Sequence, residues 1–303
     1  MNINLCMGCM REKKGNGPCP HCGFDENKYE PAPHHLPLRT ILNGKYLAGK
    51  VLGEGGFGIT YLGWDLKLEV KLAIKEYYPN GFVVRNASRS VTLLSGQNPE
   101  FFQRGRDKFV DEAKRLGKFW GLPGIVSVKD YFQENRTAYI VMEFIEGKTL
   151  KEVLTESGGR MDVETVLAMM KPVMESLEVV HREGLIHRDI SPDNIMIDDR
   201  GKVKLLDFGA ARDFLAEGER SLSVVLKPGY APEEQYRSHG KQGPWTDIYG
   251  LCATIYRAVT GEVPAESLDR VAGEKLKRPS EYGINMGKAR EDTLMKGLEV
   301  YQK

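Results

Sequence analysis

Three polar residues that could bind a metal ion and accept a proton follow apolar segments in the second half of the chain. Asp189 and Asn194 lie in HRDISPDN, after a long apolar helix pattern, and Asp207 ends the run VKLLD. Carboxylate and amide oxygens are ligands that Mg²⁺ prefers, and one more carboxylate can accept the proton of a hydroxyl group. The set predicts phosphoryl-transfer chemistry.

A glycine-rich loop, GEGGFG, lies between the apolar runs 46–52 and 59–62 and contains Gly53, Gly55, Gly56 and Gly58. Glycine has no side chain to pack and loses much backbone entropy on folding, so the cluster needs a reason. One interpretation is a hairpin turn. The other is a backbone whose bare N–H groups hold a large anion such as a phosphate.

A lysine and a glutamate could serve the same anion. In the expected strand KLAIK, Ala73 and Lys75 share a face, because side chains alternate along a strand. A helix is predicted to begin at Asn98-Pro99, with an apolar face made of Phe109, Ala113, Leu116, Phe119 and Trp120. Glu112 falls inside that face and needs a partner there, unless it marks the edge of a solvated face. Residues 80–97, between strand and helix, predict a hairpin-like insert.

Four of the five cysteines occur in two C-x-x-C pairs, CMGC (Cys6 and Cys9) and CPHC (Cys19 and Cys22). This spacing predicts a closed, structural Zn²⁺ site with four thiolate ligands; two disulfides are the alternative. His21 is then a spacer, and Cys252 a small buried hydrophobic residue.

The composition excludes several classes of protein. The 303 residues include 43 Lys and Arg against 42 Asp and Glu, so there is no net field, and no clear patch, for nucleic acid. The first residues, MNINLC, do not have the basic and apolar pattern expected of a signal peptide, and no apolar run approaches the roughly 20 residues that span a bilayer, so a cytoplasmic protein is expected. The polar, proline-containing residues 25–40 predict a linker in which His34 and His35 are simply solvated.

The segment VETVLAMMKPVMESLEVVH predicts a core helix that precedes HRDISPDN. Its apolar stripe consists of Val163, Val166, Leu167, Met170, Val173, Met174, Leu177 and His181. The stripe indicates burial against a core rather than a methionine-rich binding surface.

Seven motifs then occur in an order that resembles the eukaryotic-type protein kinases. They are the glycine loop, LAIK, the inward helix glutamate, HRDxxxxN, DFG, GYAPEE and DIYGL, from Gly53 to Asp247. The wording GGFGITY and KPGYAPEEQY resembles bacterial serine/threonine kinases. The resemblance implies an α+β, bilobal kinase fold with a small, mostly β N-lobe (41–144) and a larger helical C-lobe (145–303). A zinc ribbon (1–24) and the linker (25–40) precede it.

The resemblance also implies ATP, Mg²⁺ or Mn²⁺, and a protein substrate with a serine or threonine hydroxyl. Lys75, paired with Glu112, would contact the phosphates, Asp189 would be the catalytic base, and Asn194 and Asp207 would hold the metal. The expected contacts of the nucleotide are the loop glycines, Thr60, Ala73, Met142, Glu143, Ile145 and Met196. Arg188 would face the activation segment, where Ser221 and Ser223 are either phosphorylation sites or part of an ordinary flexible loop.

Three departures from the family pattern leave alternatives open. Thr60 replaces the glycine-loop valine that usually packs on adenine, a change of similar shape. Ser191 stands where most such kinases carry a lysine that touches the transferred phosphate. Either Glu233 or Glu234 could make the structural ion pair of GYAPEE, whose arginine partner would follow Lys303, so a chain or lobe lacking its last helix is expected. A nucleotide-binding scaffold that signals by conformation, or a small-molecule kinase, could share these motifs, and the ribbon could bind a protein partner or brace the catalytic domain.

Overall fold

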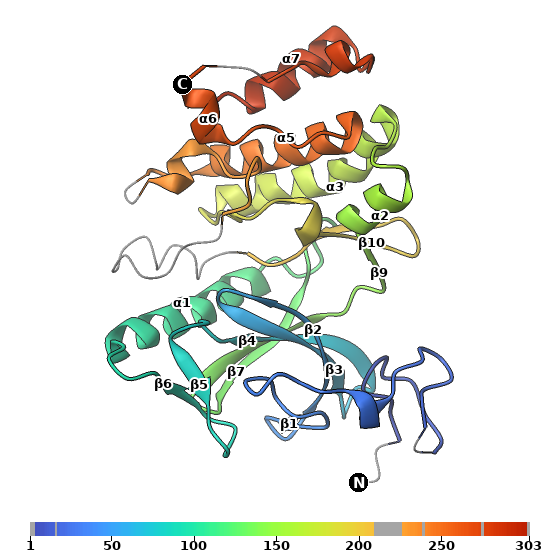
Figure 1. Ribbon diagram of the computed structural model, residues 1–303, viewed down its shortest axis with the longest axis vertical. Helices are drawn as coiled ribbons and strands as arrows, with labels where there is room; N and C mark the ends of the chain where they lie inside the picture. The colour runs from blue at the N-terminus through green and yellow to red at the C-terminus, as the bar shows by residue number, and fades with distance from the viewer. Residues whose placement is uncertain (1–3, 16, 209–225, 238–239, 274–275, 302–303) are drawn as a thin grey trace. The chain divides into compact units, whose positions relative to one another are not determined.

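The computed structural model describes residues 4–301 except for 16, 209–225, 238–239 and 274–275. The chain forms two compact units (Figure 1). Unit 1 comprises Met1–Trp120 and Ser127–Phe144, and unit 2 comprises Gly121–Val126 and Ile145–Lys303. Each unit is described by itself.

Unit 1 is built on an antiparallel six-stranded sheet with the order β1-β2-β3-β4-β8-β7. The strands are β1 (Ile41–Leu42), β2 (Tyr46–Gly55), β3 (Gly58–Asp65), β4 (Val70–Tyr77), β7 (Val128–Glu134) and β8 (Thr137–Glu143). β4 alternates buried Leu72, Ile74 and Glu76 with half-buried Ala73 and Lys75. The pleat therefore puts Ala73 and Lys75 on one face, as predicted.

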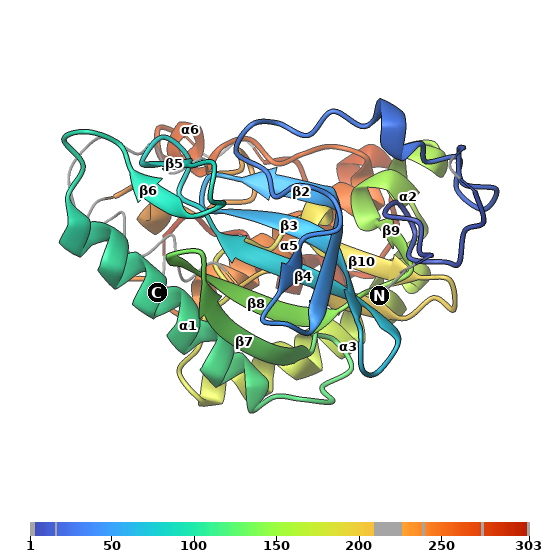
Figure 2. The same ribbon diagram turned by 90° about the horizontal axis from the view of Figure 1, so that it is seen from below.

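The helix of unit 1, α1 (Pro99–Gly117), packs on β7 and β8 (Figure 2). Its start was correctly predicted, because the Asn98 side chain accepts hydrogen bonds from the N–H groups of Glu100 and Phe101. Its end was not. The helix stops at Gly117, so Trp120 leaves the apolar face on which periodicity placed it and is 75% exposed.

Two further parts belong to unit 1. Strands β5 (Val83–Arg85) and β6 (Val91–Leu93) pair as an antiparallel hairpin within the expected insert. Near the N-terminus, buried Met7 and Met10 pack against Leu47 of β2 and Leu62 of β3. The approach is close, since a Cβ on Gly49 would lie 2.5 Å from Met10 Cε and from Met7 O.

Unit 2 combines helices with a three-stranded sheet of order β11-β10-β9. The longer elements are α2 (Leu150–Glu156), α3 (Val163–Arg182), α5 (Pro244–Thr260), α6 (Ser267–Val271) and α7 (Lys288–Gly297), with strands β9 (Gly147–Thr149), β10 (Ile195–Asp198) and β11 (Val203–Leu205). α3 lies against α5, and α5 against α7 (Figure 1). The predicted stripe of α3 is buried at Val166, Met170, Val173 and Leu177, but Met174 was wrongly placed on it and is 38% exposed.

None of the helices in the described part of the chain has both the length and the apolar character needed to cross a bilayer.

Candidate active site

The HRDISPDN segment of unit 2 is held by internal hydrogen bonds. The Asn194 amide, in the short 3-10 helix Pro192–Asn194, donates to the Asp189 side chain at 2.7 Å and to the Asp189 backbone oxygen at 2.8 Å. The first bond fixes one oxygen of the Asp189 carboxylate. The structure thus brings the predicted base and one predicted metal ligand together.

A buried aspartate of α5 anchors the start of the HRDISPDN segment. Asp247 is 1% exposed and accepts hydrogen bonds from the backbone N–H groups of His187 (2.8 Å) and Arg188 (2.7 Å). His181 Nε2 lies 2.7 Å from the same carboxylate. Arg188 has a left-handed backbone with φ 69°, a strained conformation for a residue with a side chain. Asp247 therefore stabilises a turn that the backbone alone disfavours.

His187 connects this segment to the DFG motif. It is fully buried, its Nε2 donates to Leu206 O at 2.5 Å, and its Nδ1 accepts the N–H of Asp189 at 3.2 Å. Its ring packs against Phe208. Burial lowers the pKa of His187, against the opposing charge of Asp247, so the ring is neutral and Nε2 carries its proton.

Asp207 follows β11 and is brought beside Asn194 by the backbone. The N–H of Leu206 donates to the carbonyl of Asn194 at 2.7 Å. Asp207 itself has a φ of 50°, outside the usual region for a non-glycine residue. The backbone bond thus brings the residue before Asp207 next to Asn194, and carboxylate and amide oxygens are the donor types that Mg²⁺ prefers.

Ser191 has a lysine partner that sequence reasoning missed. The Ser191 side chain is fully buried, and its Oγ accepts a hydrogen bond from Lys227 Nζ at 2.7 Å. The same Nζ lies 3.6 Å from Asp189 Oδ1 and 4.0 Å from Asp193 Oδ2. The sequence does contain a signal for this contact: KPGYAPEE begins with a lysine, and position 191 lacks one.

In unit 1, the glycine loop is the turn between β2 and β3, where Gly55 faces Gly58. A Cβ on Gly53, Gly55 or Gly56 would meet no atom within 4 Å, whereas one on Gly58 would lie 2.6 Å from Glu76 O and 3.7 Å from Lys75 Cε. Only Gly58 is therefore required by contacts within the protein. The other three leave a bare backbone over open space, which suits an anion.

Lys75 lies beneath this loop, opposite Thr60 of β3 in the register of the sheet. Ala73 faces Met142 of β8, next to Glu143. The backbone N–H of Glu143 donates to Ser127 O at 3.0 Å. Glu112 on α1 is 6% exposed, which confirms that it points inward. Its pairing with Lys75 stays a prediction.

A second buried carboxylate, Glu76, neighbours Lys75 and was not identified from the sequence. It is fully buried and accepts hydrogen bonds from Arg85 Nη2 (2.6 Å), Tyr61 Oη (3.0 Å) and Tyr139 Oη (2.9 Å). Burial, followed by the charge of Glu76, raises the pKa of both tyrosines. The hairpin thus contributes an arginine to the centre of unit 1.

The two linker histidines are not simply solvated, so that prediction was wrong. His34 Nε2 and His35 Nε2 lie 2.9 and 3.0 Å from the two oxygens of Glu54, in the glycine loop. Because His35 Nδ1 accepts the N–H of Ala32, its Nε2 carries the proton and donates. Although burial opposes it, hydrogen bonds from His35 and His34 lower the pKa of Glu54. The linker is therefore tied to the loop.

The four N-terminal cysteines meet in space and are all free thiols. Their sulfurs lie within 4.8 Å of one another, with Cys6–Cys22 at 3.7 Å and Cys9–Cys19 at 3.8 Å. A tetrahedron with metal–sulfur bonds of about 2.3 Å has edges of about 3.8 Å, so the cluster has the dimensions of a Zn²⁺ site.

The site residues that the structure describes are divided between the units. Unit 1 holds Cys6, Cys9, Cys19, Cys22, Gly53, Gly55, Gly56, Gly58, Thr60, Ala73, Lys75, Glu112, Met142 and Glu143, and unit 2 holds Ile145, Arg188, Asp189, Asn194, Met196 and Asp207. Ser221 and Ser223 lie outside the described residues.

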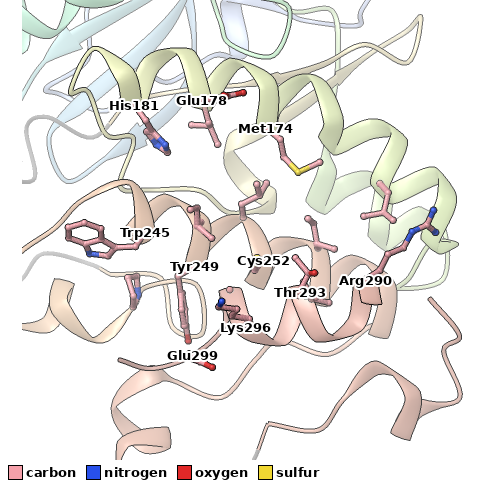
Figure 3. A pocket seen from close by; sticks show the side chains of 18 of the residues that line it. Met174, Glu178, His181, Trp245, Tyr249, Cys252, Arg290, Thr293, Lys296 and Glu299 are labelled. Atoms are coloured by element: carbon pink, nitrogen blue, oxygen red, sulfur yellow. The ribbon is translucent and has the colours of Figure 1, made fainter. Parts of the chain in front are cut away.

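A large groove of about 1420 Å³ in unit 2 contains none of these residues (Figure 3). It is lined by α3, α5 and α7, and exposes Met174, Trp245 and Ile248. Glu234 lies on its wall and accepts a hydrogen bond from Thr246 at 2.7 Å, while Glu233 pairs with Arg237. Cys252 also lines it, and burial raises the pKa of that thiol to about 12, as suits an inert residue.

These motifs and the fold define a protein kinase domain, and comparison with known proteins agrees. Residues 46–286 match the protein kinase domain family. The chain belongs to this family.

Its relatives include bacterial kinases. It is 34% identical over 230 residues to serine/threonine-protein kinase PknL of Mycobacterium bovis, covering 75% of this chain and 52% of that one. It is also 34% identical over 241 residues to serine/threonine-protein kinase PknA of Nostoc sp., covering 76% of this chain and 39% of the relative. The chain thus spans about half the length, or less, of these curated relatives.

Two solved structures are similar. "PpkA-294 apo form" has a TM-score of 0.78 and 34% identity, covering 88% of this chain and 94% of that chain. The PknI kinase domain of Mycobacterium tuberculosis has a TM-score of 0.62 and 21% identity, covering 88% and 92%, and shares the fold.

Proposed function

We propose that this chain is an ATP-dependent kinase that transfers the γ-phosphoryl group of ATP to a serine or threonine hydroxyl of a protein. The observation that carries the proposal is the Asp189–Asn194 hydrogen bond, in a loop joined to the DFG segment through His187 and Leu206. This network supports a carboxylate base close to two candidate oxygen donors for a metal. The names of the relatives support the same activity.

In the proposed reaction, Asp189 accepts the proton of the substrate hydroxyl as its oxygen attacks the γ-phosphorus. The bond from that phosphorus to the β–γ bridging oxygen breaks, and ADP leaves with the electron pair. Asn194 and Asp207 would hold Mg²⁺, which when bound neutralises the phosphate oxygens. Lys75, oriented by Glu112, would contact the α- and β-phosphates.

The remaining nucleotide contacts carry over as part of the proposal. Gly53, Gly55 and Gly56 would offer backbone N–H groups to the phosphates, since no side chain fills the space above them. Thr60, Ala73, Met142 and Met196 would contact adenine, with the carbonyl of Glu143 and the backbone of Ile145 at its edge.

The test is phosphoryl transfer from labelled ATP with magnesium to a general protein substrate. We expect transfer by the wild type and a loss of at least about a hundredfold in Asp189→Asn, which keeps the shape but not the proton acceptor. Asp198→Asn, at the half-buried end of β10, is a matched control and should keep full activity. Equal incorporation of label with the wild type and with Asp189→Asn would instead favour a nucleotide-binding scaffold that signals by conformation.

We also propose that Cys6, Cys9, Cys19 and Cys22 bind one structural Zn²⁺. Their sulfur spacing fits, and four thiolates leave no open coordination position for catalysis. The packing of Met7 and Met10 on β2 and β3 supports a role in bracing unit 1. Such free thiols suit a reducing compartment, which supports a cytoplasmic location.

Metal analysis of freshly purified, reduced protein should find one zinc per chain. Cys9→Ser should lower that content and the melting temperature of unit 1, whereas Cys252→Ser should leave the zinc content unchanged. Absence of zinc from the wild type would refute the site.

A further inference from the structure

The HRDISPDN segment, called the catalytic loop from here on, contains no lysine. A lysine ammonium nevertheless lies beside its proposed base, Asp189. Ser191 occupies the position at which the resemblance leads one to expect a phosphate-contacting lysine. Its hydroxyl instead accepts a hydrogen bond from Lys227, which lies 36 positions later in the chain. The positive charge beside Asp189 therefore comes from a different segment of the chain.

The position of Lys227 is fixed at both ends. Its carbonyl accepts the N–H groups of Tyr230 (3.0 Å) and Ala231 (3.2 Å), which closes a turn at the start of GYAPEE. At the other end, Nζ is 2.7 Å from the buried Ser191 hydroxyl. The side chain is 26% exposed, so the ammonium is held in place and still open to a ligand.

The ammonium retains donor capacity in this arrangement. It has three N–H groups, and among the contacts of the described residues only Ser191 Oγ lies within hydrogen-bond distance. The carboxylates of Asp189 and Asp193 lie farther away, at 3.6 and 4.0 Å. Nζ faces Asp189 Oδ1, whereas Asn194 binds Oδ2. A phosphate next to Asp189 would therefore meet a positive charge.

We propose that Lys227 is a catalytic residue whose ammonium contacts the γ-phosphoryl group during transfer. This inference rests on the proposed function. As the hydroxyl oxygen attacks the γ-phosphorus and its proton passes to Asp189, negative charge spreads over the γ-oxygens, and Lys227 stabilises it. Ser191 orients the ammonium, and the electron pair of the broken bond leaves with ADP. The activation segment thus completes the site.

The first experiment compares two variants of the full chain with the wild type in the labelled-ATP assay. Lys227→Met keeps the length of the side chain but removes its charge. We expect kcat to fall about 10²- to 10³-fold, the usual cost of losing one donor to a transition-state oxyanion, while KM for ATP changes much less. Lys151→Met is the matched control, because Lys151 also pairs with Asp193, at 2.9 Å, but is 67% exposed. It should keep wild-type kcat.

A purely structural role for Lys227 predicts a different result. If Lys227 only fastened the GYAPEE turn to the catalytic loop, Ser191→Ala would break the same hydrogen bond and cost as much as Lys227→Met. We expect Ser191→Ala to lose about tenfold or less, because the charge remains. The exchanged pair, Ser191→Lys with Lys227→Ser, should regain at least about tenfold over Lys227→Ser alone. Equal losses in Ser191→Ala and Lys227→Met, or wild-type kcat in Lys227→Met, would overturn the inference.

A binding measurement separates this inference from the proposed function. The wild type should bind a non-hydrolysable ATP analogue with magnesium more tightly than ADP, and Lys227→Met should lose about tenfold of that preference, the value of one charge-assisted hydrogen bond. If the wild type transfers no phosphate but the preference falls, the phosphate contact stands and the proposed activity fails. An unchanged preference in Lys227→Met overturns the contact.

Discussion

Two deeply buried carboxylates, Asp247 in unit 2 and Glu76 in unit 1, lie next to residues of the candidate site, but they are satisfied in different ways. Asp247 of unit 2 accepts backbone N–H groups from His187 and Arg188, together with the side chain of His181. Glu76 of unit 1 accepts hydrogen bonds from the side chains of Arg85, Tyr61 and Tyr139, and no backbone group is among its described partners. The first therefore fixes the path of a loop, and the second joins separate elements.

The elements joined by Glu76 are neighbours in the sheet. Tyr61 is on β3, Glu76 on β4 and Tyr139 on β8, and Arg85 reaches them from the inserted hairpin. Arg85 Nε also donates to His34 O at 2.7 Å, which extends the network to the linker. Asp247, the loop anchor, binds backbone groups of a kinase motif. Glu76, the sheet anchor, instead depends on an arginine from the β5–β6 hairpin. The family motifs therefore indicate one buried charge, Asp247, without indicating the other, Glu76.

The largest expected effect comes from removing the loop anchor. Asp247→Ala leaves two backbone N–H groups without their acceptor in a buried setting, so we expect a loss of about 3–5 kcal/mol in the free energy of unfolding. Phosphoryl transfer should fall as well, because Arg188 loses the bond that holds its strained backbone. Chemical denaturation and hydrogen exchange measure the change, which should begin in unit 2.

The exposed pair of Glu164 and Arg290 provides the control for this variant. Glu164→Ala should change stability by less than about 1 kcal/mol, as is usual for surface ion pairs. If Asp247→Ala cost no more than Glu164→Ala, the buried carboxylate would not be an anchor.

A slightly smaller effect is expected for the sheet anchor. Arg85→Met removes the charged partner of Glu76, whose side chain is fully buried, and should cost about 3 kcal/mol. Adding Glu76→Gln should recover part of this loss, because the buried negative charge is then gone. A double-mutant cycle by denaturation should give a coupling of about 1–3 kcal/mol. Strict additivity would show that Arg85 and Glu76 do not act as a pair.

Much of the site could be predicted because it depends on short segments of the chain. Asn98 and Pro99 mark the start of α1 through local capping chemistry, and alternation puts Ala73 and Lys75 on one face of β4. Asp189 and Asn194 are five residues apart, so their hydrogen bond lies within a single loop. In each case the contacts that decide the outcome are local.

The rest depends on contacts that spacing does not encode. Glu76 meets Tyr139 across 63 positions, and Ser191 meets Lys227 across 36. Helical periodicity placed Trp120 in the core, because it assumes a helix that continues, whereas α1 stops at Gly117. It also placed Met174 there, although the neighbouring helices leave that side chain at the edge of a groove.

The smallest expected effect concerns pH and the neutral histidine beside the loop anchor. Burial lowers the pKa of His187 below its usual 6.5, so as the pH falls below about 6.5 the unfolded chain binds a proton that the folded chain does not yet bind. Folding stability then falls as pH falls, by at most about 1.4 kcal/mol per pH unit for this group. Above pH 6.5 both states are neutral and the contribution disappears.

His187→Asn removes the titrating group from this buried position. The variant is expected to be less stable at every pH, because the bond to Leu206 is altered, but its stability should depend less steeply on pH between 6.5 and 5. Denaturation of both proteins at half-unit pH steps gives the difference, from which the contributions of the other histidines cancel. Parallel curves would mean that His187 binds its proton equally well in the folded and unfolded chains, so that burial does not lower its pKa. The ring beside the loop anchor would then take up charge as readily as an exposed histidine, which would remove the electrostatic contrast with the charged Arg85–Glu76 pair of unit 1.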